Sequence, residues 1–376
     1  MNLEIFESIA EISPTEWNAL SGPNDPFTSH AFFAALEESN SVGSQAGWLP
    51  IYITLKQNND IRGILPLYLK NHSYGEYIFD WSWADASERA GIPYFPKLVS
   101  AVPFTPATGP RFLMKSTNDT DVLHLWNGAL DIADSTEASS IHVLFLPEEQ
   151  MPPLAKKALP RWTHQYHWTN PGVDTFDAWL GLFRSKDRKK IRAERRRAQQ
   201  SVDRIYHLTG RELTAKHVAA VWEFYQRTAA RKWGNPYLTK AFFMELNRSL
   251  ADSTVVFFAE KNKELVASSL CFQKGENLYG RYWGCQSYND CLHFELCYHQ
   301  PIELAIQRGW KRFEAGAQGE HKIKRGLMPT KIYSAHWLRH PGLQQGIARF
   351  LEQERAATER TISMLSTHGP FKRGPS

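Results

Sequence analysis

The stretch DPFTSHAFFAALEES, residues 25–39, is followed much later by NPYLTKAFFMELNRS, residues 235–249, and this repetition decides the fold class. Aligned without a gap, both copies carry Ala-Phe-Phe and then a leucine three residues on. The apolar spacing is that of an amphipathic helix. Hydroxyl residues that can cap such a helix precede each run, Thr28 or Ser29 in the first copy and Thr239 in the second.

The segments after the two copies also correspond. Residues 51–70, IYITLKQNNDIRGILPLYLK, and residues 256–274, VFFAEKNKELVASSLCFQK, each predict a strand, a polar turn and a second strand. A helix and a hairpin, written twice, indicate an internal duplication. The spacing is too long for a solenoid repeat. We therefore expect two related domains, at 1–175 and 176–365, and a disordered tail at 366–376.

The remaining pattern alternates helices with strands. Residues 119–135 and 291–308 predict helices, and 139–147 predicts a buried strand. Residues 71–115 are rich in aromatic residues and proline, so we expect a structured loop region there rather than a helix. Each half is thus predicted to be α/β or α+β, with helices flanking a central sheet.

Composition places the chain among soluble proteins with substantial cores. It has 376 residues, 42% of them hydrophobic, and no apolar run long enough to cross a bilayer. The N-terminus carries acids and no basic leader, so we expect a cytoplasmic protein. Its four cysteines lie between residues 271 and 297 without a CxxC pair, and we interpret them as small buried apolar residues.

One segment is strongly basic. Residues 184–197, RSKDRKKIRAERRR, hold nine Lys/Arg against Asp187 and Glu194, a net of +7, while the whole chain carries +5. Such a cluster can bind the phosphates of a nucleotide, coenzyme A or tRNA. It can also be a solvated helix face. Repulsion between like charges one turn apart favours an anionic partner.

A second segment combines aromatic residues with a possible acid–base pair. YGRYWGC, residues 279–285, places Arg281 among aromatic side chains in a strand, and a predicted helix follows with His293, Glu295 and His299. Glu295 and His299 are four residues apart and share a helix face. They can act as a general base with its orienting partner, or simply satisfy each other in the interior. A third metal ligand is not evident, so we predict no metal site.

The third segment, RFEAGAQGEHKIKRG at residues 312–326, is the one in which we expect the reaction. A strand leads through Gly316 and Gly319, which permit positive φ, and consecutive amides in such a turn can bind an anion. Glu314 is expected at the strand end, with Glu320 and His321 in the loop. The alternative is a plain strand-to-loop turn.

These segments resemble the bacterial FemAB-like predicted N-acyltransferases, often described as peptidoglycan biosynthesis or recognition proteins. The resemblance covers almost the whole chain and includes YGRYWGC, LHFELCYHQ, FEAGAQGEHKI and the basic SKDRKKIRAERRR. It implies two tandem GNAT-type acyltransferase domains. It also implies transfer of an acyl or aminoacyl group from acyl-CoA or aminoacyl-tRNA to an amine, in a peptide, a peptidoglycan-related molecule or a small molecule.

One departure bears on the donor. GNAT enzymes that use acetyl-CoA carry a Gln/Arg-x-x-Gly-x-Gly/Ala loop, whereas here Arg312 is separated from Gly316 by three residues. Acyl-CoA is therefore not established. Fem-type enzymes use aminoacyl-tRNA, which would suit the basic segment. The sequence does not indicate an oligomeric state.

The resemblance and the residue chemistry together assign roles. The candidate acid–base residues are Glu314, His321, Glu320 and Glu295. The candidate donor-binding residues are Gly316, Gln318, Gly319, Lys322, Arg188, Lys189 and Arg192. The candidate substrate-binding residues are Arg281, Tyr282, Trp283, His293, Arg231 and Trp233.

Two rival functions remain. One is a binding module that recognises glycan or peptide without transfer, and the other is a nucleic-acid-binding protein. The basic residues form one cluster rather than a stripe interleaved with aromatic residues, which disfavours the second. A phosphotransferase is disfavoured because no GxxxxGK[ST] loop occurs.

Overall fold

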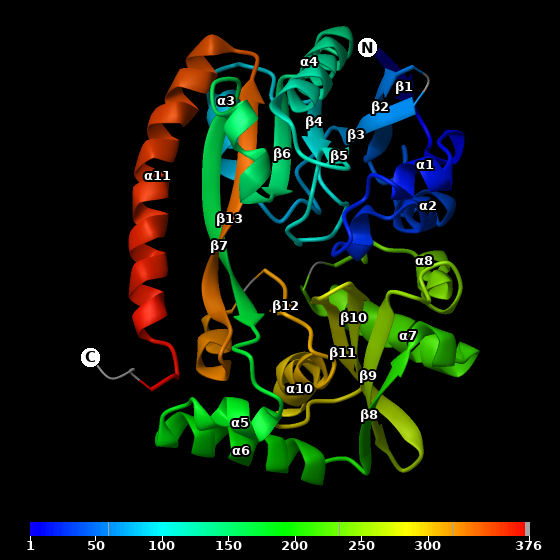
Figure 1. The fold of residues 1–376 in the computed structure, drawn as a ribbon, viewed down its shortest axis with the longest axis vertical. Helices are drawn as coiled ribbons and strands as arrows, with labels where there is room; N and C mark the ends of the chain where they lie inside the picture. The colour runs from blue at the N-terminus through cyan, green and yellow to red at the C-terminus, as the bar shows by residue number, and fades with distance from the viewer. Residues whose placement is uncertain (59, 233, 318, 373–376) are drawn as a thin grey trace. The chain divides into compact units, whose positions relative to one another are not determined.

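The structure is a computed structural model that describes residues 1–58, 60–232, 234–317 and 319–372 (Figure 1). The chain forms two compact units. Unit 1 comprises Met1–His164 and Lys331–Thr361, and unit 2 comprises Gln165–Thr330 and the residues from Ile362 onward. The boundary predicted after residue 175 lies inside unit 2. Residues 331–361, predicted in the second domain, belong to unit 1.

Unit 1 is built on a mixed sheet in the order β1-β2-β3-β4-β6-β13. The parallel pair is β4·β6, and the neighbouring pairs β1·β2, β2·β3, β3·β4 and β6·β13 are antiparallel. The short strand β5 pairs with β3, and the first part of β7 lies next to β13. The strand bounds are β1 Asn2–Phe6, β2 Leu49–Gln57, β3 Asp60–Lys70, β4 Lys97–Ser100, β5 Leu113–Met114, β6 Ser140–Leu146, β7 Leu159–Thr169 and β13 Met328–Leu338.

Unit 2 repeats this order with different strands. Its sheet runs β8-β9-β10-β11-β12-β7, with β11·β12 parallel and the other neighbouring pairs antiparallel. The bounds are β8 Arg204–Thr209, β9 Thr254–Lys261, β10 Glu264–Lys274, β11 Asn277–Cys285 and β12 Arg312–Glu314. Strand for strand, the neighbours and their directions match unit 1. The predicted internal duplication and the α/β class are confirmed.

The last strand of each sheet, β13 in unit 1 and β7 in unit 2, explains why neither unit is one continuous segment of the chain. Unit 1 uses β13, from near the C-terminal end of the chain, and unit 2 uses residues 165–169 of β7, from before its first helix. Each unit therefore completes its sheet with a strand from the other predicted half. No single cut in the sequence can describe this exchange, because strand pairing does not require neighbours in sequence.

The repeated opening forms a helix in both units. α2, His30–Glu38, follows Ser29, and α8, Lys240–Met244, follows Thr239, whose hydroxyl accepts from the Phe242 amide. The Phe-Phe pairs of both helices are buried. Each helix precedes an antiparallel hairpin, β2·β3 or β9·β10, as predicted. The shared sequence thus encodes the same local unit twice.

The other helices have the following bounds. In unit 1 they are α1 Pro14–Asn18, α3 Trp81–Arg89 and α4 Asp119–Ser135, and α11 Pro341–Thr367 includes residues of both units. In unit 2 they are α5 Phe176–Gly181, α6 Ser185–Gln200, α7 Ala215–Lys232, α9 Leu292–Phe294, a π-helical turn Glu295–His299, and α10 Gln300–Gln307. Short 3₁₀ turns occur at Ile9–Glu11, Pro26–Thr28, Glu148–Gln150, Pro152–Leu154, Gly210–Glu212, Glu245–Asn247 and Glu320–Arg325.

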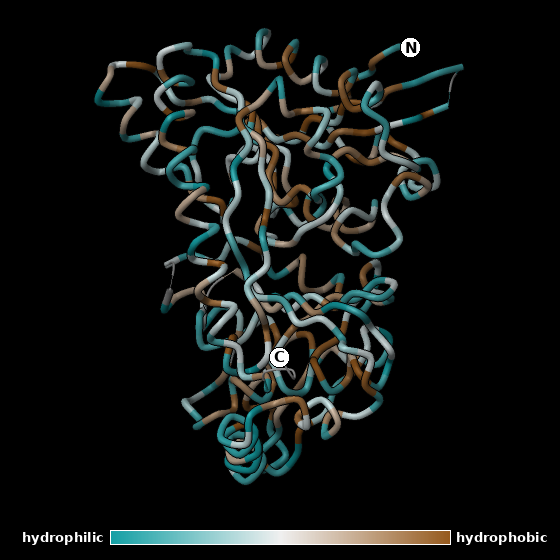
Figure 2. The backbone as a smooth tube through the Cα atoms, turned by 60° about the vertical axis from the view of Figure 1, so that its left-hand side comes forward, coloured by the Kyte–Doolittle hydropathy of each residue, from teal (hydrophilic) through white to brown (hydrophobic). Residues whose placement is uncertain are grey.

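Hydropathy follows this architecture. Figure 2 shows α6, at the bottom of the view, as an almost wholly hydrophilic helix. In unit 1, α4 packs Leu125 and Trp126 into the core with strand residues such as Ile53. All four cysteines are free, and three of them are buried. None of the helices in the described ranges has the length and hydropathy that a membrane span requires.

Two local predictions differ from the structure. Residues 366–372, predicted as part of a disordered tail, end α11 and return to unit 2, where Phe371 pairs with Phe183 and the Arg184 amide donates to the Pro370 carbonyl (2.9 Å). Residues 373–376 lie outside the described residues. The predicted loop at 71–115 contains the helix α3 and the short strands β4 and β5, so it has more regular structure than expected.

α3 begins beside a buried ionic cluster. The Lys97 ammonium donates to Asp80 (2.5 Å), Glu76 (2.9 Å) and Ser73 (2.8 Å), and Tyr94 donates its hydroxyl to Asp80 (2.7 Å). All these side chains are buried. A buried carboxylate is stable only while its partners remain. The cluster therefore ties the 71–80 loop to β4.

We expect Lys97→Met to destabilise the protein by about 3–5 kcal/mol, because it leaves Asp80 as a buried charge without its ammonium partner. The measurement is chemical denaturation of the full chain. Lys56→Met is the control, since Lys56 pairs with Glu4 on the surface (2.7 Å), and should change stability by less than about 1 kcal/mol. Equal effects of the two variants would contradict this account.

A buried histidine pair joins β6 to β13. His142 and His336 are register partners, and their Nδ1 atoms are 2.7 Å apart. Each Nε2 lies 2.8 Å from a serine hydroxyl, Ser140 or Ser334. Burial, reinforced by the charge of Lys97, lowers the pKa of His142 to about 3, and burial also lowers the pKa of His336. Both imidazoles are therefore neutral in the folded protein at neutral pH.

This pair predicts acid sensitivity. Below about pH 6.5 the two histidines bind protons in the unfolded chain but not in the folded protein. Their contribution to the free energy of unfolding should therefore fall as the pH is lowered from about 6.5 to about 3, and it should be constant above about pH 6.5. Denaturation at several pH values measures this slope. Replacing both His142 and His336 by leucine should reduce the slope, and His124→Gln, at an exposed position of α4, should not. An unchanged slope in the double variant would refute the assignment.

Candidate active site

The predicted reaction segment forms a turn that requires two glycines. β12 ends at Glu314, and the chain passes through Gly316 (φ 79°) and Gly319 (φ 113°) into the 3₁₀ turn Glu320–Arg325. These φ values favour glycine. The ammonium of buried Lys322 donates to the Gly316 carbonyl (2.8 Å). Lys322, predicted to bind donor phosphate, therefore also closes the turn.

Glu314 is the last residue of β12, which lies between β11 and β7 in the sheet. In the sheet it faces Tyr279 on one side and His167 on the other. Its carboxylate is 3.2 Å from the Arg312 guanidinium and 3.7 Å from His167 Nε2. The side chain is only 2% exposed. A substrate amine would have to displace this packing to reach the carboxylate.

His167 was not identified from the sequence. Burial lowers its pKa to about 3, assisted by the charges of Arg312 and Lys322, so the imidazole beside Glu314 is neutral at neutral pH. The residue belongs to β7, far from the 312–326 segment in sequence. Only the pairing of β7 with β12 brings it to Glu314, and no local pattern signals that pairing.

His321 lies at an accessible edge of the turn. Its Nε2 is 2.9 Å from the Tyr298 hydroxyl. Burial, together with the positive charges of Arg325 and Lys322, lowers the pKa of His321, so the ring is neutral at neutral pH. Burial raises the pKa of Tyr298, which keeps its proton. Tyr298, also missed from the sequence, lies in the π-helical turn.

The other nitrogen of His321 faces Gly319. A Cβ placed on Gly319 would lie 2.4 Å from His321 Cε1 and 2.8 Å from Nδ1. Glycine at 319 therefore allows this edge of the ring to lie beside the turn without a collision, and the His321 residue as a whole is exposed. If Nε2 carries the proton and donates to Tyr298, Nδ1 retains a lone pair that can accept a proton.

Aromatic rings surround His321. Its ring centroid is 5.7 Å from Phe294 and 6.3 Å from His293, and His293 is 5.3 Å from Trp283. Three predicted residues, Trp283, His293 and His321, are thus connected through ring contacts. Phe294 is the member that sequence analysis missed, because it reads as an ordinary core position.

Glu295 has a different environment from the one expected. Its buried carboxylate accepts from Arg195 (3.1 Å) and Gln300 (2.8 Å). His299, its predicted partner, instead lies 3.5 Å from Glu194. Within the described residues, no group of three or more His, Cys, Asp or Glu side chains could hold a metal ion.

The basic segment is helix α6, and its two faces differ. Ile191, Glu194 and Ala198 are buried, whereas Arg192 pairs with Asp177 (3.0 Å) and Arg188 donates to the Phe183 carbonyl (3.3 Å). The exposed cations of α6 include Lys186, Lys189, Lys190 and Arg196. The outer face therefore keeps a dense positive charge that an anion can approach.

The other predicted residues are more scattered. Arg281 donates to the Tyr282 hydroxyl (3.3 Å), and Glu320 is exposed beside His321. Arg231 is exposed on α7 and donates to the Arg227 carbonyl (3.2 Å). Trp233 and Gln318 lie outside the described residues.

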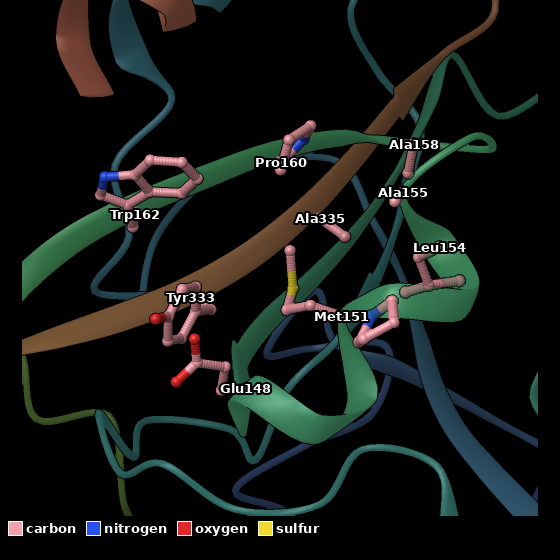
Figure 3. A pocket seen from close by; sticks show the side chains of 10 residues that line it. Glu148, Met151, Leu154, Ala155, Ala158, Pro160, Trp162, Tyr333 and Ala335 are labelled. Carbon is pink, nitrogen blue, oxygen red and sulfur yellow. The ribbon is translucent and has the colours of Figure 1, made fainter. Parts of the chain in front are cut away.

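Unit 1 contains a pocket that is separate from the predicted site residues. It has a volume of about 240 Å³ and is lined by apolar residues, Tyr333 and the single carboxylate of Glu148 (Figure 3). A second apolar pocket of about 360 Å³ lies between α3 and the start of α11. No predicted site residue lines either pocket.

The turn predicts a sharp cost for a side chain at Gly319. Gly319→Ala should destabilise the protein by about 1–3 kcal/mol, because alanine at positive φ is strained and its Cβ would collide with His321. Gly346→Ala is the control. Gly346 lies within α11 with no atom near its absent Cβ, so alanine there should be neutral or stabilising. Denaturation measures both, and a Gly319→Ala protein as stable as the wild type would contradict this geometry.

The chain was compared with proteins of known sequence and structure. No curated protein matches the chain. Among solved structures, FemX has a TM-score of 0.56 and 12% identity over 93% of this chain and 100% of its own. L-PGS from Bacillus licheniformis has a TM-score of 0.51 and 10% identity over 85% and 95%. A protein of unknown function from Bacteroides thetaiotaomicron has 0.53 and 10% over 89% and 99%.

At these identities the structures establish a shared fold and nothing more. The match that carries further is a family model described as peptidoglycan biosynthesis/recognition, which extends over residues 8–373. That model spans both units and every site residue described above. The chain therefore belongs to the FemAB-like family.

Proposed function

We propose that the protein is an N-acyltransferase in which His321 is the general base. It transfers an acyl or aminoacyl group from an activated donor to an amine, and the family description favours an amine on a peptidoglycan-related peptide. The observation that carries the proposal is the exposed imidazole of His321, with Nδ1 beside Gly319, which has no side chain, and Nε2 against Tyr298.

The chemistry requires one proton acceptor and no covalent enzyme intermediate. The amine nitrogen attacks the carbonyl carbon of the donor ester or thioester while Nδ1 takes the amine proton. The tetrahedral intermediate then expels the donor oxygen or sulfur, which receives the proton back from the imidazolium. Backbone amides around Gly316 are the proposed donors to the oxyanion.

The geometry favours His321 over Glu314 as the base. Glu314 is buried and held by Arg312, whereas His321 is accessible and neutral at neutral pH. Glu314 and His167 would then support the turn from beneath. Glu320, exposed beside His321, and Arg281 with Trp283 and His293 are proposed to contact substrate.

The donor is proposed to be an aminoacyl-tRNA, with acyl-CoA as the alternative. The exposed cations of α6, among them Lys189, offer a surface for a polyphosphate chain. A protein named FemX and an L-PGS share the fold. The absence of the usual coenzyme A loop spacing at Arg312–Gly316 points in the same direction.

A transfer assay tests the proposal. The purified full chain is incubated with a labelled mixture of aminoacyl-tRNAs, or with acyl-CoA thioesters, and a peptidoglycan-precursor peptide that carries a free amine. Mass spectrometry detects the new amide. His321→Gln should reduce turnover about 10²- to 10⁴-fold, and the wild-type rate should fall only in acid, because burial and the nearby cations lower the pKa of His321.

The control is His340→Gln, since His340 is an exposed residue at the start of α11 and should leave turnover unchanged. Full activity of His321→Gln would remove His321 from the mechanism. No amide from any donor, with peptide binding that survives His321→Gln, would instead identify a non-catalytic recognition module.

A further inference from the structure

The most basic stretch of the chain contains one buried acid. Glu194 is flanked by arginines in α6, yet its side chain is only 4% exposed and points into unit 2. Burial opposes its ionisation, but the bond with His299 and the charge of Arg325 lower the pKa of Glu194. The Glu194 carboxylate is therefore charged although it is buried. The question is what its ion pair with Arg325 does for the site.

Arg325 makes three different contacts. Its Nε and Nη2 donate to the two Glu194 oxygens (3.1 and 2.8 Å), its Nη1 donates to the His321 carbonyl (2.8 Å), and its guanidinium carbon lies 3.4 Å from the Phe294 ring centre. Phe294 in turn contacts the His321 ring. A planar fork can make all these contacts at once, and a lysine ammonium cannot.

We propose that Glu194 and Arg325 are positioning residues for His321. Glu194 fixes the plane of the Arg325 guanidinium, and Arg325 then holds the His321 backbone from one side and the Phe294 ring from the other. The inference deepens the proposed function and rests on it, since positioning matters only if His321 reacts. It assigns the inward face of α6 to the catalytic turn, while the outward face remains available to an anion.

The charges around His321 give the pair a distinct signature. The ring is faced by Arg325 and Lys322 from its own turn, by Tyr298 and His293 from the preceding helical segment, and by Glu194 from α6. After burial, Arg325 has the largest lowering effect on the pKa of His321, and Glu194 opposes it. Glu194→Gln should therefore move the His321 titration to lower pH. Loss of the charge is enough to cause that shift, so the positioning role itself is tested by Arg325→Lys, which keeps the charge and removes the planar fork.

The experiment is a histidine-selective NMR titration of the full chain, with the His321 signal assigned from its loss in His321→Gln. We expect Glu194→Gln to shift the midpoint downward. We expect Arg325→Lys, which keeps the charge and loses the fork, to change the ring environment and reduce turnover about 10²-fold, as a misplacement near 1 Å does, with little change in KM. The control is Arg211→Lys, outside α6 in a surface pair with Asp252, which should change neither.

The outcomes separate this inference from the proposed function. If the His321 signal and its midpoint are the same in wild type, Glu194→Gln and Arg325→Lys, the positioning role is excluded even if the protein is a transferase. If the signals shift as expected but no transfer occurs with any donor, the positioning geometry stands and the proposed function fails. If both variants lose the folded state, the pair is a structural one and the inference is overturned.

Discussion

The absence of a side chain at Gly319 is the constraint on which the candidate site depends. β12 ends at Glu314, and the chain then continues through two glycines with positive φ, Gly316 and Gly319. This turn brings His321 against Tyr298 and places its Nδ1 edge beside Gly319, where there is no side chain. Any larger residue at position 319 would cover the atom that the proposed chemistry uses. Glycine at position 319 therefore has two effects: it permits the positive φ of the turn, and it leaves no side chain beside His321 Nδ1.

Buried ion pairs hold the elements around that turn. Arg325–Glu194 and Arg195–Glu295 connect the turn and the π-helical segment to α6. Such pairs add little net stability when compared with apolar packing, but removing one partner is costly. They therefore specify geometry more than they strengthen the fold. α6 combines this inward role with an outward face of exposed cations, so its high charge serves two purposes that its composition alone could not separate.

The sequence predicted the helices and hairpins that are determined by the pattern of neighbouring residues. The repeated Ala-Phe-Phe helices, both hairpins, α4 and the helical segment at 291–308 follow from periodicity, and side-chain caps are present at α4 and α8. What it could not predict depends on long-range pairing. β7 and β13 exchange between the two units, and this exchange brings His167 to Glu314. α3 was missed because its start is fixed by the Asp80–Lys97 contact rather than by a helical pattern. At the site, the ring contacts joined His293, Trp283 and His321, whereas Glu295 and His299 found separate partners.

The tautomer of His321 tests the central claim most directly. Nitrogen-15 chemical shifts of the two ring atoms at neutral pH report which one carries the proton. The account predicts a neutral ring with the proton on Nε2, towards Tyr298, and an unprotonated Nδ1 beside Gly319. A ring protonated on Nδ1, or an imidazolium at neutral pH, would contradict it, because no lone pair would then face the open edge.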